Sequence, residues 1–258
     1  KTTVKELIGN LLSNKYETGR TVGNQNNQLG LPLTILNQGR GEVLVVEMGM
    51  DQPGEIEKLS EWARPRMGVI THIGPEHLEG LGSVEVAARE NARLFSSLPE
   101  DGLAFMPEGI RRKNQLQQIS AVQPRQVGYE IVEKNTGVPP STRIKINSET
   151  YQLPFAASHL IQNISLSIAV ARELGVFPRD IQTFLETVEL LPGRGRVHRL
   201  GETQIIDGSY NANPDSFSTV IDRFQNFPAP RLALVGDMLD LGEKSELFHR
   251  DLGDQLSE

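Results

Sequence analysis

Two short apolar runs, each leading into polar residues, constrain this chain most. Residues 43–48 read Val-Leu-Val-Val-Glu-Met, and residues 67–71 read Met-Gly-Val-Ile-Thr. Continuous apolar runs of this length are typical of strands buried on both faces of a parallel sheet. Helical spacing of apolar residues at 3–14, 55–63 and 83–98 alternates with these runs. The alternation predicts an α/β fold with a mostly parallel sheet, whose strands carry functional groups at their carboxyl ends.

The second half of the chain predicts an antiparallel insertion and then a second domain. Within residues 125–155, short extended runs flank a Gly/Pro/Ser/Thr-rich segment at 137–142, which is typical of antiparallel strands. Leu191-Pro192-Gly193 then interrupts the chain, so we expect one α/β domain over 1–193 and part of another over 194–258. The other predicted elements are helices at 159–174, 179–189, 214–225 and 243–258, and strands near 196–200, 203–207 and 231–236.

Both ends of the chain indicate a fragment. The sequence begins Lys1-Thr2-Thr3 without Met and enters a helix at once, and it stops inside the helix predicted over 243–258. We therefore expect a piece of a longer protein, cut at both ends.

Composition argues against several classes of function. The net charge of -7 and the absence of a basic block argue against nucleic-acid binding. The chain has no cysteine, which excludes disulfides, thiolate metal sites and cysteine nucleophiles. No apolar run approaches the roughly 20 residues that a membrane-spanning helix needs, so no membrane insertion is expected. We expect a cytoplasmic monomer.

Three parts of the sequence contain residue types that can bind a phosphate or a metal ion. Lys1-Thr2-Thr3 before a helix matches the end of a phosphate-binding P-loop, although such a start is more often an ordinary helix N-terminus. Glu47 ends the first apolar run. A carboxylate at this place can bind Mg²⁺, or it can simply face solvent. The loop at 71–80 follows the second run and holds His72, His77 and two glutamates; a loop histidine is more often neither a metal ligand nor a phosphate contact.

Six segments, in family order, resemble the Mur ligase family, and within it the MurF type. The first, fifth and sixth of them are specific to that type. The segments are Gly23-Asn-Gln-Asn-Asn-Gln-Leu-Gly-Leu-Pro-Leu-Thr34, Val46-Glu-Met-Gly49 with Gly54-Glu-Ile56, His77-Leu-Glu-Gly-Leu-Gly-Ser83, Pro192-Gly-Arg-Gly-Arg196, Ser209-Tyr-Asn-Ala-Asn-Pro-Asp-Ser216 and Gly236-Asp-Met-Leu-Asp-Leu-Gly242.

This resemblance implies a fold and a reaction. The implied fold is a P-loop-type ATP-binding central domain with a mostly parallel sheet, followed by part of a Rossmann-like C-terminal domain. The implied reaction joins D-alanyl-D-alanine to a UDP-N-acetylmuramoyl tripeptide in peptidoglycan synthesis, through an acyl phosphate, with ATP and Mg²⁺ as cofactors. Because phosphates and a carboxylate meet in the first step, cations must stabilise much of the charge.

The resemblance also implies roles for individual residues. Lys1 would contact the phosphates, Thr2 and Glu47 would hold one Mg²⁺, and Glu47 with His77 would hold a second. The residues expected to line the muramoyl-peptide site are Asn24, Asn26 and Asn27. The residues expected to bind ATP are Lys1, Thr2, Thr3, Asn163, Arg194, Tyr210, Asn211 and Asn213. The expected catalytic residues are Lys1, Glu47, His77 and Asn91.

Some positions depart from the family pattern. Asn91 stands where family members commonly place a carbamylated lysine that bridges the second metal, and residues 84–98 contain no lysine. Asn91 shares a helical stripe with apolar residues, so we expect it to face inward, either in the site or as a hydrogen-bonded core amide. Gly208 replaces the family's aspartate, although Asp207 comes one position earlier.

Two alternatives remain at this point. One is a related ligase with another acceptor, of the folylpolyglutamate or cyanophycin type; the Asn-rich segment and the Tyr210–Asn213 loop argue against it. The other is a non-catalytic Mur-like scaffold that binds nucleotide or a partner. Asn91 and Gly208 favour the scaffold, while the retained Thr2, Glu47 and His77 argue against it.

Overall fold

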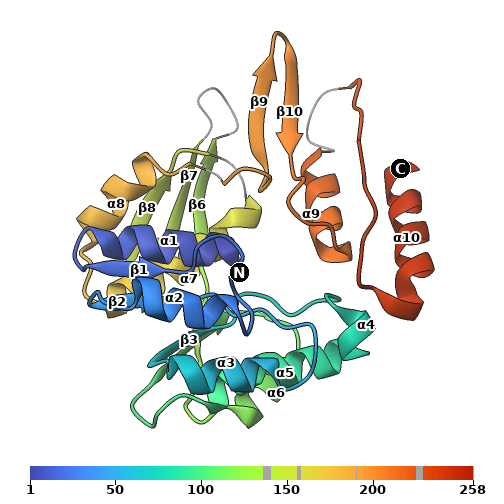
Figure 1. The fold of residues 1–258 in the computed structure, drawn as a ribbon. Helices are drawn as coiled ribbons and strands as arrows, with labels where there is room; N and C mark the ends of the chain where they lie inside the picture. Colours follow the sequence, from blue (N-terminus) through green and yellow to red (C-terminus); the bar gives the residue numbers. More distant parts are fainter. Residues whose placement is uncertain (136–140, 156–157, 190, 225–228, 258) are drawn as a thin grey trace. The chain divides into compact units, whose positions relative to one another are not determined.

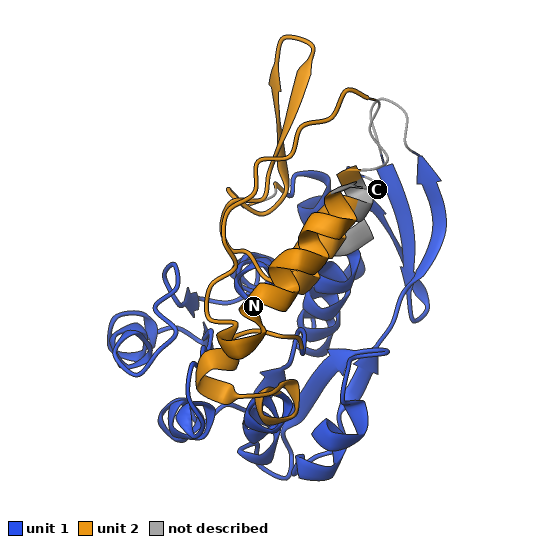
Figure 2. Cartoon of the chain, turned by 90° about the vertical axis from the view of Figure 1, so that its right-hand side faces the viewer, with its two compact units in different colours: residues 1–73, 88–188 blue, residues 74–87, 189–258 orange. Residues whose placement is uncertain are grey.

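The structure is a computed structural model that describes residues 1–135, 141–155, 158–189, 191–224 and 229–257 (Figure 1). Contacts divide the chain into two compact units (Figure 2). Unit 1 comprises residues 1–73 and 88–188, and unit 2 comprises residues 74–87 and 189–258.

Unit 1 contains the parallel strands. Strand β1 (Thr18–Arg20) pairs in parallel with β2 (Val43–Val45). In a second sheet, β3 (Met67–Val69), β4 (Leu103–Pro107) and β5 (Arg125–Val127) pair in parallel in that order. Its first helices are α1 (Thr2–Ser13), α2 (Gly30–Gln38), α3 (Glu55–Ala63) and α6 (Lys113–Ile119), and α5 (Val84–Ser96) runs from unit 2 into unit 1. The predicted α/β fold with parallel strands is confirmed.

Helix α1 anchors the core of unit 1. Its residues Val4, Leu7, Ile8, Leu11 and Leu12 are buried, as the helical spacing predicts. The helix packs against α7 (Ser158–Glu173), and the Tyr16 hydroxyl donates a hydrogen bond to the Leu174 carbonyl at 2.7 Å. This packing ties α1 to α7 within unit 1.

An antiparallel sheet forms the predicted insertion. Strands β6 (Glu130–Asn135), β7 (Ser141–Ile146) and β8 (Glu149–Leu153) pair in that order, with Ile144 opposite Tyr151. Alternate residues of β7 and β8 are buried, and helix α8 (Pro178–Glu186) packs on β8. The prediction is confirmed for the strands, while most of the 137–142 segment lies outside the described residues.

Unit 2 has a small core. Its strands β9 (Arg196–Leu200) and β10 (Thr203–Asp207) form an antiparallel hairpin. Its helices are α4 (Leu78–Leu81), α9 (Pro214–Phe224), the 3₁₀ helix η1 (Gly242–Lys244) and α10 (Ser245–Ser257). A buried cluster gathers residues from α9, from α10 and from the segment between them: Ile221, Met238, Leu241 and Leu252. Among the described residues of both units, no helix is long and apolar enough to cross a membrane.

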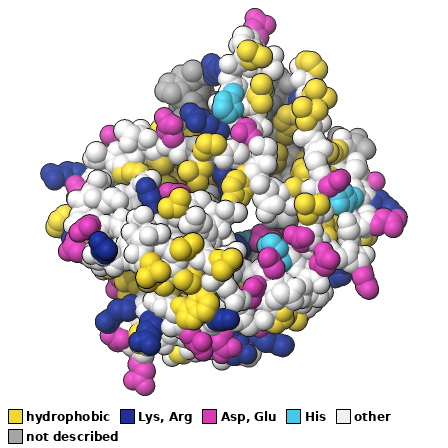
Figure 3. Space-filling model, viewed as in Figure 1, with side chains coloured by type: hydrophobic (Ala, Val, Ile, Leu, Met, Phe, Trp, Pro, Cys, Tyr) yellow, Lys and Arg dark blue, Asp and Glu magenta, His cyan; other side chains and the backbone are white. Residues whose placement is uncertain are grey.

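The strand predicted at 231–236 was wrong. The described residues of this segment belong to no helix or strand, and Leu232 and Leu234 are 79% and 91% exposed. Figure 3 shows hydrophobic side chains on the surface of the molecule. A buried parallel strand needs neighbours on both sides, and no described strand pairs with this segment, so its apolar pattern alone does not make it a strand.

Candidate active site

Glu47 lies just beyond the end of β2, as its place in the sequence predicts. Its backbone N–H donates a hydrogen bond to the Thr21 hydroxyl at 3.0 Å, and the Thr21 N–H donates to the Val45 carbonyl at 3.0 Å. Thr21 itself follows β1, so two adjacent parallel strands end together at this carboxylate. Only 6% of Glu47 is exposed. The side chain therefore sits at the carboxyl edge of a parallel pair, where open α/β sheets bind ligands.

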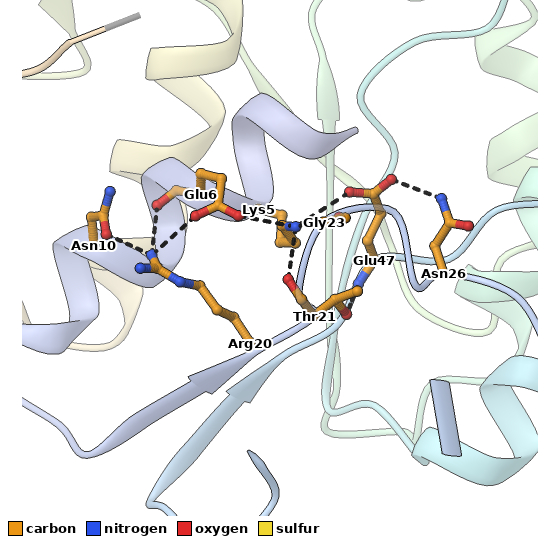
Figure 4. Close-up of polar contacts among 8 residues, drawn as sticks. All are labelled: Lys5, Glu6, Asn10, Arg20, Thr21, Gly23, Asn26 and Glu47. Carbon is orange, nitrogen blue, oxygen red and sulfur yellow. Dashed lines mark hydrogen bonds and ion pairs between the residues drawn. The ribbon is translucent and has the colours of Figure 1, made fainter. Parts of the chain in front are cut away.

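The two carboxylate oxygens of Glu47 have different surroundings (Figure 4). Oε1 accepts a hydrogen bond from Asn26 Nδ2 at 2.9 Å. Oε2 is buried and accepts a hydrogen bond from no described residue, and it lies 3.8 Å from Lys5 Nζ. A buried carboxylate oxygen without a donor is costly unless it meets a cation. This oxygen therefore fits a hard cation such as Mg²⁺.

Nowhere in the described part of the chain, Glu47 included, do three or more histidine, aspartate or glutamate side chains form a group that could hold a metal ion. Mg²⁺ in ATP sites is commonly bound through one or two carboxylates, with waters and phosphates as the other ligands. A single strand-end carboxylate such as Glu47 fits that arrangement.

Lys5 is a site residue that the sequence interpretation missed. Its side chain is 3% exposed, on the buried face of α1. Nζ donates hydrogen bonds to the carbonyls of Thr21 at 2.8 Å and Gly23 at 2.9 Å. The sequence did contain a signal that Lys5 is buried. Lys5 lies three and seven residues before the buried Ile8 and Leu12, and residues at these spacings share one face of a helix.

The Asn-rich segment lies beside Glu47 and is held by local hydrogen bonds. Asn26 donates to Glu47, and a Cβ atom on Gly49 would come within 2.9 Å of the Asn26 side chain. Asn27 Oδ1 accepts hydrogen bonds from the N–H groups of residues 29 and 30, just before and at the start of α2. Asn24 is exposed. The predicted metal ligand and one predicted substrate residue, Asn26, are thus in direct contact.

The predicted phosphate-binding residues stand at the start of α1. Lys1 is its N-cap and is exposed, while Thr2 and Thr3 are half-buried in its first turn. The first N–H groups of a helix and its dipole favour anions at this end. The predicted helix start is confirmed, and the phosphate contact stays a prediction.

Asn91 and Asn163 are both half-buried, on α5 and α7. Ala88, Ala92 and Phe95 are fully buried on α5, so the inward face predicted for that helix is present. The neighbouring Glu90 is also buried and accepts a hydrogen bond from the Gly54 N–H at 2.7 Å, which the sequence interpretation did not anticipate.

In unit 2, His77 contacts the segment around Asp240. His77 is the N-cap of α4 and has a φ of 52°, in the left-handed region. Its Nδ1 lies 3.7 Å from Asp240 Oδ2, and the Glu79 N–H donates to the Asp240 carbonyl at 3.1 Å. Two of the family-like segments, 77–83 and 236–242, are therefore held together.

Asn213 makes a second contact with the same loop. Its Oδ1 accepts from the Ser216 N–H at 2.8 Å, which caps α9 ahead of Pro214. Its Nδ2 donates to Glu76 Oε1 at 3.2 Å. Asn211 is exposed, and its Oδ1 accepts from the Ala212 N–H.

The predicted domain junction is tied to the Tyr210 loop. The Arg194 guanidinium lies 3.8 Å from the centre of the Tyr210 ring. The Asp207 carboxylate accepts hydrogen bonds from Ser209 Oγ at 2.6 Å, from the Ser209 N–H and from the Gly193 N–H at 3.0 Å. The hydrogen bonds from Ser209, and then the one from Gly193, hold the pKa of Asp207 below its usual value. Asp207 thus anchors this turn, although Gly208 occupies the family's aspartate position.

The predicted site residues therefore fall into two groups. Glu47, the Asn-rich segment, Lys1 to Thr3, Asn91 and Asn163 belong to unit 1, and His77, Arg194 and the Tyr210–Asn213 loop belong to unit 2. A second metal shared by Glu47 and His77 stays a prediction.

Comparison with known families defines the class. The family model of the Mur ligase middle domain matches residues 1–171, and that of the Mur ligase glutamate ligase domain matches residues 193–258. The chain belongs to the Mur ligase family.

Particular relatives are similar over the whole chain. The UDP-N-acetylmuramoyl-tripeptide–D-alanyl-D-alanine ligase of Bacillus subtilis is 31% identical over 100% of this chain and 58% of its own length. A crystal structure of MurF from Acinetobacter baumannii is 28% identical with a TM-score of 0.91, over 100% of this chain and 59% of that one. MurF ligase from Thermotoga maritima in complex with ADP is 31% identical with a TM-score of 0.86, over 99% and 61%. The chain thus spans about three-fifths of the length of these relatives.

Proposed function

We propose that this chain is the central domain and part of the C-terminal domain of a MurF-type ligase. The enzyme would join D-alanyl-D-alanine to a UDP-N-acetylmuramoyl tripeptide in the cytoplasm. Support comes from the family membership, from the order of the six segments and from relatives named for this reaction. The observation that carries the proposal is the buried Glu47 carboxylate, which has one oxygen on Asn26 and the other without a hydrogen-bond donor among the described residues.

The proposed reaction has two steps. The terminal carboxylate of the tripeptide attacks the γ-phosphate of ATP, which gives an acyl phosphate and ADP. The amine of D-alanyl-D-alanine then attacks the acyl carbon, and phosphate leaves with the formation of the amide bond. Bound Mg²⁺ would offset the negative charge of the phosphates.

The residues of the chain have separate tasks in this proposal. Glu47 and Thr2 hold the cation, and Lys1 with the first N–H groups of α1 binds phosphate oxygens. Asn26 orients the Glu47 carboxylate and faces the substrate together with Asn24 and Asn27. From the second domain, Arg194 and the Tyr210–Asn213 loop bind the nucleotide, as does Asn163 from the first. We place the domain boundary at residues 193 and 194 and expect a monomer.

A chimera tests the proposal. The 258 residues replace the matching segment of the Bacillus subtilis ligase, and phosphate release is measured with UDP-N-acetylmuramoyl tripeptide, ATP and Mg²⁺, with and without D-alanyl-D-alanine. We expect release that depends on the dipeptide and that Glu47→Gln reduces by at least about a hundredfold. Binding of ADP, followed by fluorescence, serves as the folding control.

Two other outcomes would contradict the proposal. Release that depends on glutamate and not on the dipeptide would indicate a folylpolyglutamate-type acceptor. ADP binding without any release would favour a nucleotide-binding scaffold. In that case Asn91→Lys tests whether the family's lysine is the missing group.

A further inference from the structure

Lys5 is a buried charge whose ammonium group faces a buried carboxylate. Helix α1 buries this lysine at 3% exposure among the apolar residues of its inner face. A buried ammonium group is costly unless its donors find acceptors and its charge finds a partner. The surroundings of Lys5 meet both requirements, so the lysine has a defined place in unit 1.

The oxygen atoms around the Lys5 ammonium group come from three parts of the chain (Figure 4). Two are the carbonyls of Thr21 and Gly23, which border the Asn-rich segment, at 2.8 and 2.9 Å. One is Glu6 Oε1 on the same helix, at 3.0 Å. The last is Glu47 Oε2 at 3.8 Å, the oxygen that accepts a hydrogen bond from no described residue.

We propose that Lys5 is a built-in counter-charge and positioning residue for Glu47. In the cation-free protein, the ammonium group stabilises the buried carboxylate and holds the backbone at Thr21 and Gly23 beside it. The inference rests on the proposed function only in treating Glu47 as a cation ligand. The pairing of the two charges can be tested without ATP or substrate.

Neighbouring charged side chains would keep Lys5 in place when Glu47 binds a cation. Glu6 lies between Lys5 and Arg20, with its Oε2 3.3 Å from Arg20 Nη1. Lys5 would therefore keep Glu6 and two carbonyls as partners after Glu47 turned toward a cation. Its positive charge would then lower the affinity of Glu47 for a divalent ion. Lys5 would thus order the site when no cation is bound, and it would weaken the binding of the cation to Glu47.

A double-mutant cycle tests the counter-charge. Lys5→Met, Glu47→Gln and the double variant are compared by urea unfolding of the 258-residue chain, followed by the fluorescence of Trp62, the single tryptophan, which lies in unit 1. We expect Lys5→Met to raise the unfolding constant on the order of a hundredfold, because it leaves a buried carboxylate unpaired. Neutralising Glu47 as well should recover at least about tenfold of that loss. Lys5→Arg, which keeps the charge, should lose less than Lys5→Met.

Lys15, in the turn that follows α1, offers a matched control. Its Nζ also donates to two carbonyls, those of Leu174 at 3.1 Å and Gly175 at 2.8 Å, but it is exposed. Lys15→Met removes hydrogen bonds to carbonyls without removing a charge beside Glu47. Its effect should add to that of Glu47→Gln without coupling.

The outcomes separate the proposal from a purely structural role. If Lys5→Met and Glu47→Gln are additive, or if Lys5→Met fails to fold whether or not Glu47 is neutralised, Lys5 only caps carbonyls and the proposal is overturned. Folding of the double variant where Lys5→Met does not fold supports it. Addition of Mn²⁺ gives a second measurement.

The Mn²⁺ measurement addresses the cation itself. Mn²⁺ should raise the melting temperature of Lys5→Met more than that of the unmodified chain. The shift corresponds to at least about tenfold tighter binding, because a positive charge near Glu47 has been removed. Equal shifts in the two proteins, including no shift in either, would show that Lys5 does not govern a cation at Glu47.

Discussion

Units 1 and 2 hold their candidate site residues by different means. Unit 1 places Glu47 at the end of paired parallel strands and surrounds it with buried side chains. In unit 2, every residue of β9 is exposed, and the site residues are held by hydrogen bonds and ion pairs near the surface. The difference teaches that burial holds the candidate residues of unit 1 in place, whereas local turns and caps hold those of unit 2.

The largest expected difference concerns the cores. Leu12→Ala removes a fully buried side chain of α1 in unit 1 and should cost about 2–5 kcal/mol. Leu200→Ala removes a side chain of β9 that is 72% exposed and should change stability by less than about 0.5 kcal/mol. Urea unfolding followed by Trp62 fluorescence measures the first, and hydrogen exchange of the α9 amides measures the second. A similar loss of stability in both variants would contradict the difference between the two units.

A smaller effect is expected at the turn that precedes β9. Gly193 has a φ of 71°, and a Cβ atom there would come within 3.0 Å of the Tyr210 backbone nitrogen. Gly193→Ala should therefore cost more than Gly201→Ala, which shares the positive φ but faces open space. We expect Gly201→Ala, the control, to lower the stability by about 1–2 kcal/mol. Gly193→Ala should lower the stability by about 1–2 kcal/mol more. Hydrogen exchange of the Gly195 amide measures both, and equal protection would show that the turn does not depend on close contact with Tyr210.

The contact between His77 and Asp240 should contribute less still. The two side chains are 29% and 56% exposed, and such pairs are worth less than about 1 kcal/mol and weaken with salt. Asp240→Asn keeps a residue that tolerates the left-handed φ of 61° at this position. Amide exchange at Glu79, measured at low and high salt, reports the change. A large effect that salt does not alter would mean that unit 2 also relies on a buried charge.

The smallest effect should be local and should depend on pH. The pKa of Asp207 is lowered in the folded chain, chiefly by the hydrogen bonds from Ser209. Its contribution is therefore present above the pKa of the unfolded chain and is lost as the pH falls through the lower pKa of the folded state. Exchange of the Gly193 and Ser209 amides, corrected for intrinsic rates, should rise at acid pH in the parent chain. Asp207→Asn should remove this pH dependence, and an unchanged profile would contradict the role of the carboxylate.

The sequence predicted those elements whose side-chain pattern is local. Helix α3 matches the predicted 55–63, because its apolar residues repeat at helical spacing against charged neighbours. Helix α2 was missed because Leu33 and Leu36 are exposed, so its sequence does not separate a polar face from an apolar one. The strand at 231–236 was wrong because pairing depends on distant parts of the chain, which its own residues do not specify.

For the site, the sequence located Glu47 because a carboxylate after a continuous apolar run is unusual and falls at a sheet edge. Lys5 was missed because a lysine is expected at the surface, and only its spacing with Ile8 and Leu12 marked it as buried. The contact of Asp207 with Gly193 could not be predicted, because the two residues are 14 positions apart in the sequence and only the hairpin brings them together.

The exposed leucines at 232 and 234 bear on how the chain behaves in concentrated solution. They are two residues apart in a segment that belongs to no helix or strand, and exposed apolar residues in this pattern favour pairing between identical chains. Charge repulsion opposes such association at neutral pH, where the net charge is -7. That repulsion is weakest near the isoelectric point of about 5.4 expected from the composition, so turbidity should be greatest there, and Leu234→Lys should lower it.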